Sequence, residues 1–319
     1  MALLLREKHV RTLLSMQDAI AVLEDAFGAL AKGTMFNQPR SRLSFPHGVL
    51  NYLAAAAPGY GVFGYKTYTA SRERVRHLIV LFSAFDGQLL ALIEANWLGA
   101  IRTGATSALA TKYLARREAA VVGMIGSGNQ AVTQLMGVCA VRPITDIFVY
   151  SRRRQEREFF CEEMSHVLNL DVYPVDTPQQ AVEAADILIT ATTASEPVFR
   201  GEWLHPGCHI NAIGSNWSQR RELDCDALNH CSLIVTDSLD QAETEAGDFI
   251  IPAKQGEFSW DDVYELATVV SGEGPQRELP EEITLYKGLG IALEDIAAAA
   301  RVYYLANQHG IGEEVDLLL

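Results

Sequence analysis

One stretch decides the fold of this chain: Val121-Val122-Gly123-Met124-Ile125-Gly126-Ser127-Gly128-Asn129-Gln130-Ala131. It joins an apolar run to a segment of helical spacing through the pattern Gly-x-Gly-x-x-Ala, which is typical of the first turn of a dinucleotide-binding domain. Gly126 suits the tight turn, and Gly128 lets backbone N–H groups approach a pyrophosphate at the N-terminus of the following helix. Ala131 is an accepted third residue. We therefore expect a dinucleotide cofactor at this turn, in contact with Gly126, Ser127, Gly128 and Gln130.

Short apolar runs recur from residue 119 onward, and most of the segments between them look helical. The runs cover residues 119–125, 145–150, 171–175, 186–191, 208–213 and 232–237. Fully apolar runs that alternate with amphipathic helices predict a parallel sheet covered on both faces. The sequence thus predicts an α/β fold with a doubly wound Rossmann domain of six strands.

The first hundred residues follow a different pattern. Ser15 and Asp18 resemble a capping box at the start of a helix that ends at Gly33. Short apolar or aromatic runs then predict strands, two of which flank the hairpin turn Asp86-Gly87. Asn96 is expected to cap the helix that follows. This region is therefore predicted to be an α+β domain.

The length of 319 residues suits about two domains of roughly 150 residues each. An Ala-rich helix is predicted over 289–310, beyond the sixth strand of the sheet. We expect this helix to return to the N-terminal domain. The expected division is residues 1–115 with 292–319 for substrate binding and dimerisation, and residues 116–291 for the Rossmann NAD(P)-binding domain.

Composition and charge exclude several classes of protein. Hydrophobic residues make up 49% and charged residues 21% of the chain, as in ordinary globular proteins, so a disordered chain is excluded. The formal net charge of −14 repels a phosphate backbone, so no nucleic-acid partner is expected. The apolar runs are too short for a membrane span or a signal peptide, so we expect a cytoplasmic protein without a membrane partner. The five cysteines lack Cys-x-x-Cys spacing and predict reduced thiols rather than disulfides or a metal site.

The end of the second predicted strand bears on the choice of cofactor. NAD enzymes usually place Asp or Glu there, where it bonds the ribose 2′-hydroxyl. Here the strand ends at Ser151, and Arg152, Arg153 and Arg154 follow it. Guanidinium groups suit bidentate phosphate contacts, whereas the helix dipole disfavours cations at a helix N-terminus. We expect Ser151, Arg152 and Arg153 to bind a 2′-phosphate, which favours NADP(H) over NAD(H); the alternative is that these arginines are a solvated helix start.

Three cationic residues stand among apolar neighbours in the first domain. Arg40 follows Pro39, Lys66 lies in the middle of an apolar strand, and Arg102 lies near the start of an apolar helix. Buried Lys and Arg are rare unless they are paired, so an anionic ligand would satisfy them. The alternative is that each is a surface residue whose aliphatic stem packs on apolar atoms. The sequence spacing of these three residues does not show whether they lie close together in the fold.

At this point several segments match a known family. The chain resembles the ornithine cyclodeaminase/mu-crystallin family over nearly its whole length, on the segments Gln38-Pro39-Arg40, the strand with Lys66, Ile101-Arg102-Thr103-Gly104-Ala105-Thr106, Ile125-Gly126-Ser127-Gly128-Asn129-Gln130-Ala131, Asn211-Ala212-Ile213-Gly214-Ser215 with Arg221-Glu222-Leu223-Asp224, and Gly288-Leu289-Gly290-Ile291-Ala292-Leu293-Glu294-Asp295. The resemblance implies a Rossmann domain, an N-terminal domain completed by the C-terminal helix, and a homodimer. It also implies hydride transfer between a nicotinamide and the α-carbon of an amino or imino acid.

The resemblance further implies roles for single residues. The family's carboxylate clamp falls on Arg40, Lys66 and Arg102, which would orient an α-carboxylate so that its α-carbon faces the nicotinamide. Lys66 would also take part in proton transfer if burial and the two arginines lower its pKa. Contacts to the cofactor would fall on Thr103, Thr192, Asn211, Ala212, Ile213, Gly214, Arg220, Gly288 and Leu289.

Two positions depart from the pattern of the cyclodeaminases. Asn51 stands where they carry the Glu that binds the distal amine of ornithine, and Asn216 stands where they carry a catalytic Asp. Each lost charge-assisted bond is worth about 1.5–3 kcal/mol, so ornithine is expected to bind and react poorly. The alternative is that the two asparagines only look aligned across loops. Asn216 could instead bond the imine nitrogen or its water.

The resulting hypothesis is an NADP(H)-dependent oxidoreductase acting on a small imino or amino acid. The favoured reaction is reduction of a cyclic ketimine such as pyrroline-2-carboxylate or piperideine-2-carboxylate. The alternatives are an alanine-type or opine-type amino acid dehydrogenase, an ornithine cyclodeaminase, and a mu-crystallin-like protein that binds NADPH and a ligand with little turnover. The side chain of the substrate is not predicted, although Tyr52, Phe63, Trp97 and Trp217 are candidates to line its pocket, and each is equally expected in the core.

Overall fold

Alternating burial along β5 (Val62–Ser71) shows how the first sheet is built. From Val62 to Lys66 the even-numbered side chains are buried and the odd-numbered ones are exposed, as in a strand with one covered face. The neighbours β4 (Gly48–Ala57) and β6 (Val75–Ser83) pair with it antiparallel. The strands predicted in this region are therefore confirmed.

The computed structural model describes residues 1–71 and 75–316, and the chain divides into two units. The first comprises Met1–Ala105 with Gly290–Leu319, and the second comprises Thr106–Leu289. One helix, α3 (Asn96–Leu114), contains the boundary between Ala105 and Thr106.

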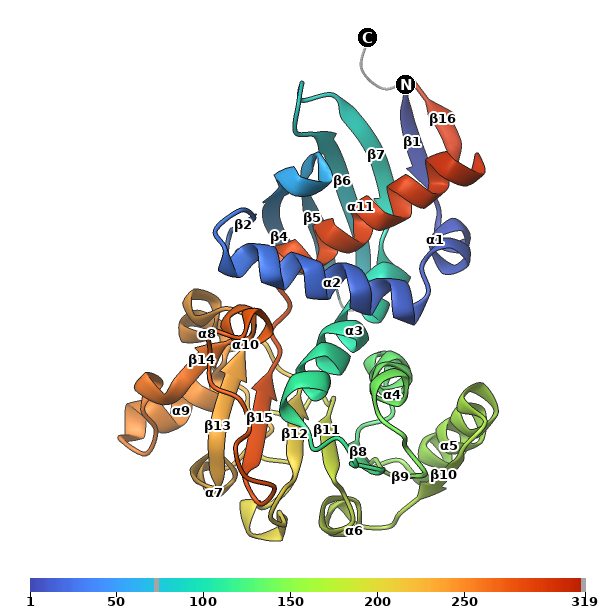
Figure 1. The fold of residues 1–319 in the computed structure, drawn as a ribbon. Coiled ribbons are helices and arrows are strands. Elements are labelled where there is room, and N and C mark those ends of the chain that lie inside the picture. The colour runs from blue at the N-terminus through green and yellow to red at the C-terminus, as the bar shows by residue number, and fades with distance from the viewer. Residues whose placement is uncertain (72–74, 317–319) are drawn as a thin grey trace. The chain divides into compact units, whose positions relative to one another are not determined.

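The first unit is a mixed sheet of eight strands with helices on one face (Figure 1). Its strands run in the order β16-β1-β7-β6-β5-β4-β2, and β3 pairs with β4. The remaining elements of this unit are β1 (Ala2–Leu5), α1 (Glu7–Leu13), α2 (Met16–Ala31), β2 (Phe36–Asn37), β3 (Ser41–Phe45), η1 (Pro58–Tyr60), β7 (Leu89–Glu94), α11 (Ala292–His309) and β16 (Glu313–Val315). The C-terminal helix α11 packs on β4, β5 and β6 and also contacts α2. This helix therefore covers the buried face of the sheet.

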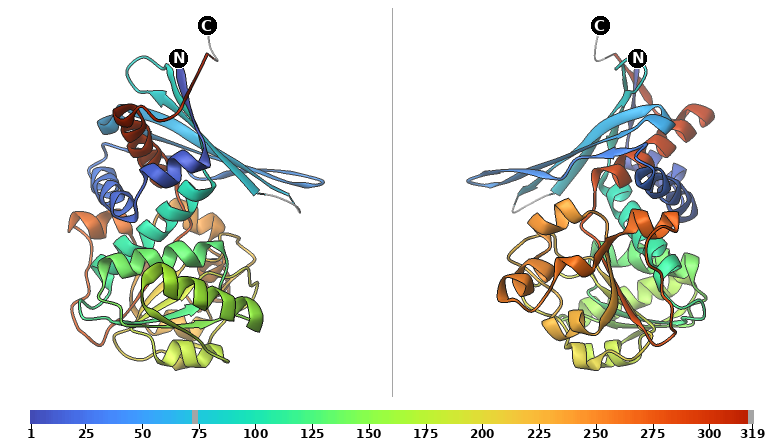
Figure 2. Two further views of the ribbon diagram at one scale, coloured as in Figure 1. Left: turned by 90° about the vertical axis from the view of Figure 1, so that its right-hand side faces the viewer. Right: turned by 60° about the vertical axis from the view of Figure 1, so that its left-hand side comes forward.

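The opposite face of this sheet carries large apolar side chains that face solvent. Cross-strand register places on it Phe36, Leu43, Phe45, Tyr52, Phe63 and Tyr65, each at least 39% exposed. In Figure 2 the helices of this unit lie on the other side of the sheet. We call this surface the open face.

The second unit is a parallel sheet of eight strands in the order β10-β9-β8-β11-β12-β15-β13-β14. Its strands are β8 (Val121–Ile125), β9 (Asp146–Tyr150), β10 (Asp171–Pro174), β11 (Ile187–Thr190), β12 (His209–Ala212), β13 (Cys231–Thr236), β14 (Val263–Glu265) and β15 (Ile283–Lys287). The doubly wound fold is confirmed, but the prediction of six strands is wrong. Two strands were missed, and β15 inserts between β12 and β13.

Helices and short turns connect these strands and pack on the sheet. They are α4 (Asn129–Val141), α5 (Arg154–Leu168), α6 (Pro178–Glu183), η2 (Gly201–Trp203), α7 (Cys225–Asn229), α8 (Leu239–Glu245), α9 (Gly247–Gln255), η3 (Trp260–Asp262) and α10 (Leu266–Ser271). Two apolar clusters form the core, one around Leu135, Val149 and Met164 and the other around Leu188, Ile210 and Phe249. No helix within the described part of the chain is long and apolar enough to cross a membrane.

Local capping signals are only partly correct. The Oγ atom of Ser15 accepts from the backbone N–H of Asp18 at the start of α2, as predicted. The predicted capping role of Asn96 is wrong, because its side chain accepts from His77 instead. The carboxylate of Glu7 accepts from the backbone N–H groups of Asn96 and Trp97 and takes the place of that cap.

Candidate functional site

A buried cluster of charges forms where α11 begins. Lys66 on β5 and Arg102 on α3 are 4% and 6% exposed, and both bind Asp295 in the first turn of α11. Nζ of Lys66 lies 3.0 Å from Oδ1 and 3.1 Å from Oδ2, and Nε of Arg102 lies 2.9 Å from Oδ1. One carboxylate therefore fixes both cations in place.

Two further charged residues complete this cluster. Glu294 accepts from Nη1 of Arg102, and Nη2 of Arg40 donates to the carbonyl oxygen of Gly290 at 2.8 Å. Gly290 has φ +77°, and a Cβ atom there would lie 2.7 Å from the Arg102 guanidinium, so the backbone needs glycine at this position. Three cations, Arg40, Lys66 and Arg102, thus lie with two carboxylates at the start of α11.

Burial changes the acidity of these groups. The pKa of Lys66 is lowered to about 8, chiefly by desolvation and also by the charges of Arg102 and Arg40, while Asp295 opposes the shift. The pKa of Asp295 is lowered, because the charges of Arg102 and Lys66 outweigh its burial. The ammonium group of Lys66 thus loses its proton more readily than an exposed lysine does.

The same face of the sheet carries polar residues one row away from Lys66. Asn51, Tyr68 and His77 lie directly opposite one another on β4, β5 and β6. Asn51 is 2% exposed, and among the described residues nothing donates to its Oδ1. Tyr52 and Phe63 lie on the open face instead, so they do not line a pocket beside Lys66.

The second unit carries the glycine turn of a dinucleotide site. Gly126 has φ +118°, and a Cβ atom there would lie 2.4 Å from the carbonyl oxygen of Ala191, whereas the space around Gly128 is open. Gly128 directly precedes α4, so the first N–H groups of this helix are accessible beside an open glycine. Oγ of Ser127 donates to Oγ of Ser151 at 3.0 Å and ties the turn to the end of β9. This geometry fits a pyrophosphate.

The arginines after β9 differ in their surroundings. Arg153 binds Glu156 at 2.6 Å and Arg154 binds Glu158 at 2.7 Å along the exposed side of α5. Arg152 is exposed. Arg157, which was not predicted, is buried and donates to the carbonyl oxygen of Ser151 at 3.0 Å.

A second buried charge network fixes the loops beyond the glycine turn. Glu222 accepts from Oγ1 and the backbone N–H of Thr192 and from the backbone N–H of Gly214. Burial raises the pKa of Glu222, and the charge of Lys287 opposes this shift. Lys287 binds Asp248 at 2.8 Å and donates to the carbonyl oxygen of Ser215 at 2.7 Å, although both charged side chains are fully buried. The network holds the ends of β11, β12 and β15 together.

The remaining predicted residues fall into two groups. Asn211, Ala212 and Leu289 are buried, and the Asn211 amide donates to Oγ1 of Thr111 at 2.9 Å. The exposed or half-buried ones are Thr103, Gln130, Ile213, Asn216 and Arg220. Gly288 packs tightly, since a Cβ atom there would lie 2.8 Å from Cδ1 of Ile213. The cofactor positions in the second unit thus line strand ends and loops, and Thr103 lies on α3 in the first unit.

Sequence reasoning missed the roles of Glu294, Asp295 and His77. Two acids in the first turn of a helix are ordinarily explained by the helix dipole, so their sequence position gave no signal of burial. His77 follows Arg76 and precedes the continuous apolar run of residues 78–82 on β6, so no period-two pattern marked its face.

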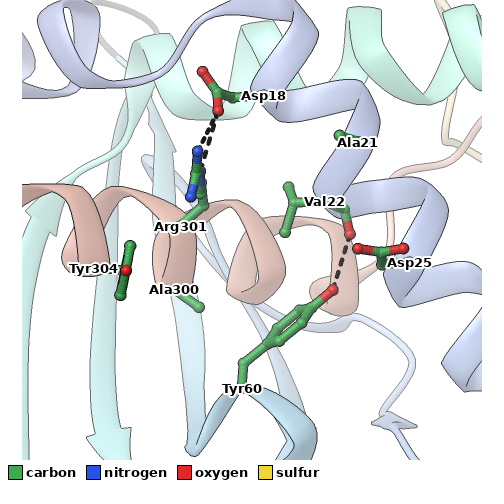
Figure 3. Close-up of a pocket in the computed structure, with 8 residues that line it drawn as sticks. All are labelled: Asp18, Ala21, Val22, Asp25, Tyr60, Ala300, Arg301 and Tyr304. Atoms are coloured by element: carbon green, nitrogen blue, oxygen red, sulfur yellow. Dashed lines mark hydrogen bonds and ion pairs between the residues drawn. The ribbon is translucent and has the colours of Figure 1, made fainter.

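A separate hollow lies between α2, η1 and α11 (Figure 3). Its volume is about 490 Å³, and its lining includes Asp18, Asp25, Tyr60, Arg301 and Tyr304. Arg301 donates to Oδ1 of Asp18 at 2.6 Å, and Asp25 adds a second acid to the lining. This hollow therefore suits a carboxylate less well than the cluster at Asp295.

Comparison with known proteins gives consistent matches over the whole chain. A model of the ornithine cyclodeaminase/mu-crystallin family matches residues 2–310. A Delta(1)-pyrroline-2-carboxylate reductase of Bacillus cereus is 33% identical over 98% of this chain and 99% of its own. The solved structure of Thermococcus litoralis Delta(1)-pyrroline-2-carboxylate reductase in complex with NADH and L-proline is 37% identical, with a TM-score of 0.95, over 98% of this chain and 100% of that chain. An archaeal alanine dehydrogenase dimer with bound NAD is 31% identical, with a TM-score of 0.94, over 99% of each chain.

Proposed function

Because the chain belongs to the ornithine cyclodeaminase/mu-crystallin family, we propose that it is an NADP(H)-dependent reductase of cyclic α-imino acids such as pyrroline-2-carboxylate or piperideine-2-carboxylate. The observation that carries the proposal is the cluster of Arg40, Lys66 and Arg102 at the start of α11, where Asp295 binds the buried Lys66 and Arg102 and Gly290 binds Arg40. Three cations gathered at one place suit a carboxylate ligand. The reductases of Bacillus cereus and Thermococcus litoralis, which act on a compound of this class, support the choice of substrate.

The residues of the cluster bind and orient the substrate. Arg40, Lys66 and Arg102 hold the α-carboxylate, and Asp295 keeps two of these cations from moving. A bound nicotinamide supplies the hydride that the α-carbon of the protonated imine accepts, and the C=N electron pair goes to nitrogen. Lys66, with its pKa of about 8, exchanges a proton with the substrate nitrogen or its water near neutral pH. The product is a cyclic secondary amino acid.

The preference for NADP(H) over NAD(H) is also part of the proposal. Ser151 replaces the acid that binds the ribose hydroxyls in NAD enzymes, and Arg152 next to it is exposed. Arg153 is paired with Glu156, and Arg154 is paired with Glu158. The proposed preference for NADP(H) therefore rests mainly on Ser151 and Arg152. NADH and NAD are the cofactors named for the Thermococcus litoralis and archaeal relatives, so the preference is a property to be tested for this chain.

We further propose a homodimer that forms through the open face. Six large apolar side chains, each at least 39% exposed, share this face of the first sheet. A contiguous apolar surface of this kind is typical of an interface. The archaeal alanine dehydrogenase, whose structure is a dimer, supports this assembly.

Initial rates of nicotinamide oxidation test the proposed function. Pyrroline-2-carboxylate, piperideine-2-carboxylate and pyruvate with ammonia are each offered with NADPH and with NADH, and ornithine with NAD serves as the control. We expect turnover of a cyclic imine with NADPH preferred. Faster turnover of pyruvate with ammonia would instead indicate an alanine dehydrogenase. Proline formed from ornithine would contradict the roles given to Asn51 and Asn216, and binding of NADPH without any turnover would indicate a ligand-binding protein.

A further inference from the structure

We propose that His77 contacts the substrate nitrogen: its Nε2 atom accepts a hydrogen bond from the N–H of the protonated imine while the cluster at Asp295 holds the carboxylate. The proposal rests on the proposed function for the identity of the substrate. It adds a neutral acceptor beside the charged groups of the cluster.

His77 lies on the same face of the sheet as Lys66 and one row away. Lys66 is opposite Ile79 and Tyr68 is opposite His77, so both side chains point to the face that α11 covers. The rings of Tyr68 and His77 are 4.7 Å apart between centroids, and Nζ of Lys66 lies 5.6 Å from the Tyr68 ring centroid. In an α-imino acid the nitrogen and the carboxylate share one carbon. A group that binds this nitrogen must therefore lie next to the carboxylate site, as His77 does.

The hydrogen bonds of Asn96 determine which nitrogen of His77 carries the proton. The backbone N–H of His77 donates to the side-chain oxygen of Asn96 at 3.2 Å, so the atom that faces His77 is an acceptor. Nδ1 of the imidazole lies 3.0 Å from the same oxygen and must itself be the donor. In the neutral ring Nε2 then has a free lone pair. Among residues 1–71 and 75–316 no side chain or backbone group donates to it.

The surroundings keep this imidazole neutral. The pKa of His77 is lowered to about 4, chiefly by burial and also by the charges of Lys66 and Arg102, while Asn96 and Asp295 oppose the shift. A carboxylate at this position would pair with Lys66 and compete with the substrate. A neutral acceptor avoids that competition and still binds a protonated imine.

A purely structural role for His77 makes a different prediction, and two substitutions separate the roles. In His77→Asn the amide nitrogen falls near the position of Nδ1, so the bond to Asn96 is kept and the acceptor is lost. In His77→Gln the amide oxygen reaches the position of Nε2, so the acceptor is kept and the bond to Asn96 is lost. Our proposal predicts that His77→Gln retains more function than His77→Asn; a structural role predicts the reverse order.

The decisive measurement compares two inhibitors that share a carboxylate. Pyrrole-2-carboxylate carries a ring N–H donor, and furan-2-carboxylate has an oxygen in its place. We expect the unmodified protein with bound NADPH to bind the pyrrole compound about tenfold more tightly. His77→Gln should keep a preference for pyrrole, and His77→Asn should bind both compounds equally and lose about 10- to 100-fold in kcat/KM for the imine.

Equal binding of the two compounds by the unmodified protein would overturn the proposal even if neither variant folds. A pyrrole preference that survives in His77→Asn would overturn it as well. Because these measurements report binding and not turnover, they test the contact of His77 separately from the proposed reductase activity. A pyrrole preference without imine turnover would refute the proposed function and leave the role of His77 standing.

Discussion

Nζ of Lys66 lies 3.0 Å from Oδ1 and 3.1 Å from Oδ2 of Asp295, although the two residues are 229 positions apart in the chain. The C-terminal helix α11 thus supplies the counter-charge for a lysine on β5. The same carboxylate binds Nε of Arg102 at 2.9 Å. The cationic site is therefore complete only when the last helix packs on the first sheet.

Replacing Asp295 with Asn should destabilise the protein. The change leaves Lys66 and Arg102 buried without the carboxylate that binds both of them, and breaking a buried pair costs about 3–5 kcal/mol. We expect a loss of about 3 kcal/mol in the free energy of unfolding, measured by urea titration of NADPH-free protein. Asp18→Asn is the matched control, because its salt bridge with Arg301 is partly exposed and should be worth at most about 1 kcal/mol. Equal losses in the two variants would contradict the assignment.

The affinity for a carboxylate should decline above pH 8. Deprotonation of Lys66 at its pKa of about 8 removes one positive charge from the cluster. The protonated form binds the anion, so affinity is present below this pKa and is lost as the pH rises through it. We expect the inhibition constant of furan-2-carboxylate to rise about tenfold per pH unit between pH 8.5 and 10, measured against imine turnover.

Two variants check that Lys66 is the titrating group. Lys66→Arg, titrated directly with furan-2-carboxylate, should bind it with the same affinity across this range, because arginine stays protonated. Asp295→Asn should move the decline to lower pH, because the charge of Asp295 raises the pKa of Lys66. His77 does not interfere, since its pKa is about 4. A decline that persists unchanged in Lys66→Arg would assign it to another group.

The sequence predicts elements whose signals are local. The glycine turn at Gly126 and the cap at Ser15 depend on residues within a few positions of each other, and both occur as predicted. The strand β15 (Ile283–Lys287) was missed because its place between β12 and β13 depends on packing with strands far away in the sequence. Asn96 has the composition of a cap, but Glu7 takes that role from another segment.

In the candidate site, too, contacts between residues far apart in the sequence could not be predicted. Residue type alone indicated Arg40, Lys66 and Arg102 as isolated cations, and only the family resemblance suggested that they act together. Asp295 was not assigned a role, because its burial becomes visible only when α11 packs on β5. The tautomer of His77 depends on Asn96 and on no neighbour in the sequence.

Removing the guanidinium of Arg152 should change the choice of cofactor. One charge-assisted phosphate contact is worth about 1.5–3 kcal/mol, so Arg152→Ala should raise KM for NADPH about 10- to 100-fold and leave KM for NADH unchanged. Ser151→Asp should invert the preference by repelling the 2′-phosphate and binding the ribose hydroxyls. Arg154→Ala is the control, because Arg154 binds Glu158 on the exposed side of α5. If NADPH and NADH are used equally by the unmodified protein, the preference assigned to Ser151 and Arg152 is wrong.

A charge on the open face should separate the proposed dimer. Phe63 is 39% exposed and stacks on Phe82 at 5.3 Å between ring centroids, so Phe63→Asp would bury a carboxylate in the interface without opening the core. We expect the unmodified protein to sediment at twice the 35.0 kDa of one chain. Phe63→Asp should dissociate at least about 100-fold more readily, as for a central aromatic contact. Tyr304→Asp changes an aromatic residue that is 59% exposed on the helix-covered side, and it should leave the mass unchanged. A dimer that Tyr304→Asp disrupts and Phe63→Asp spares would place the interface on the helices instead.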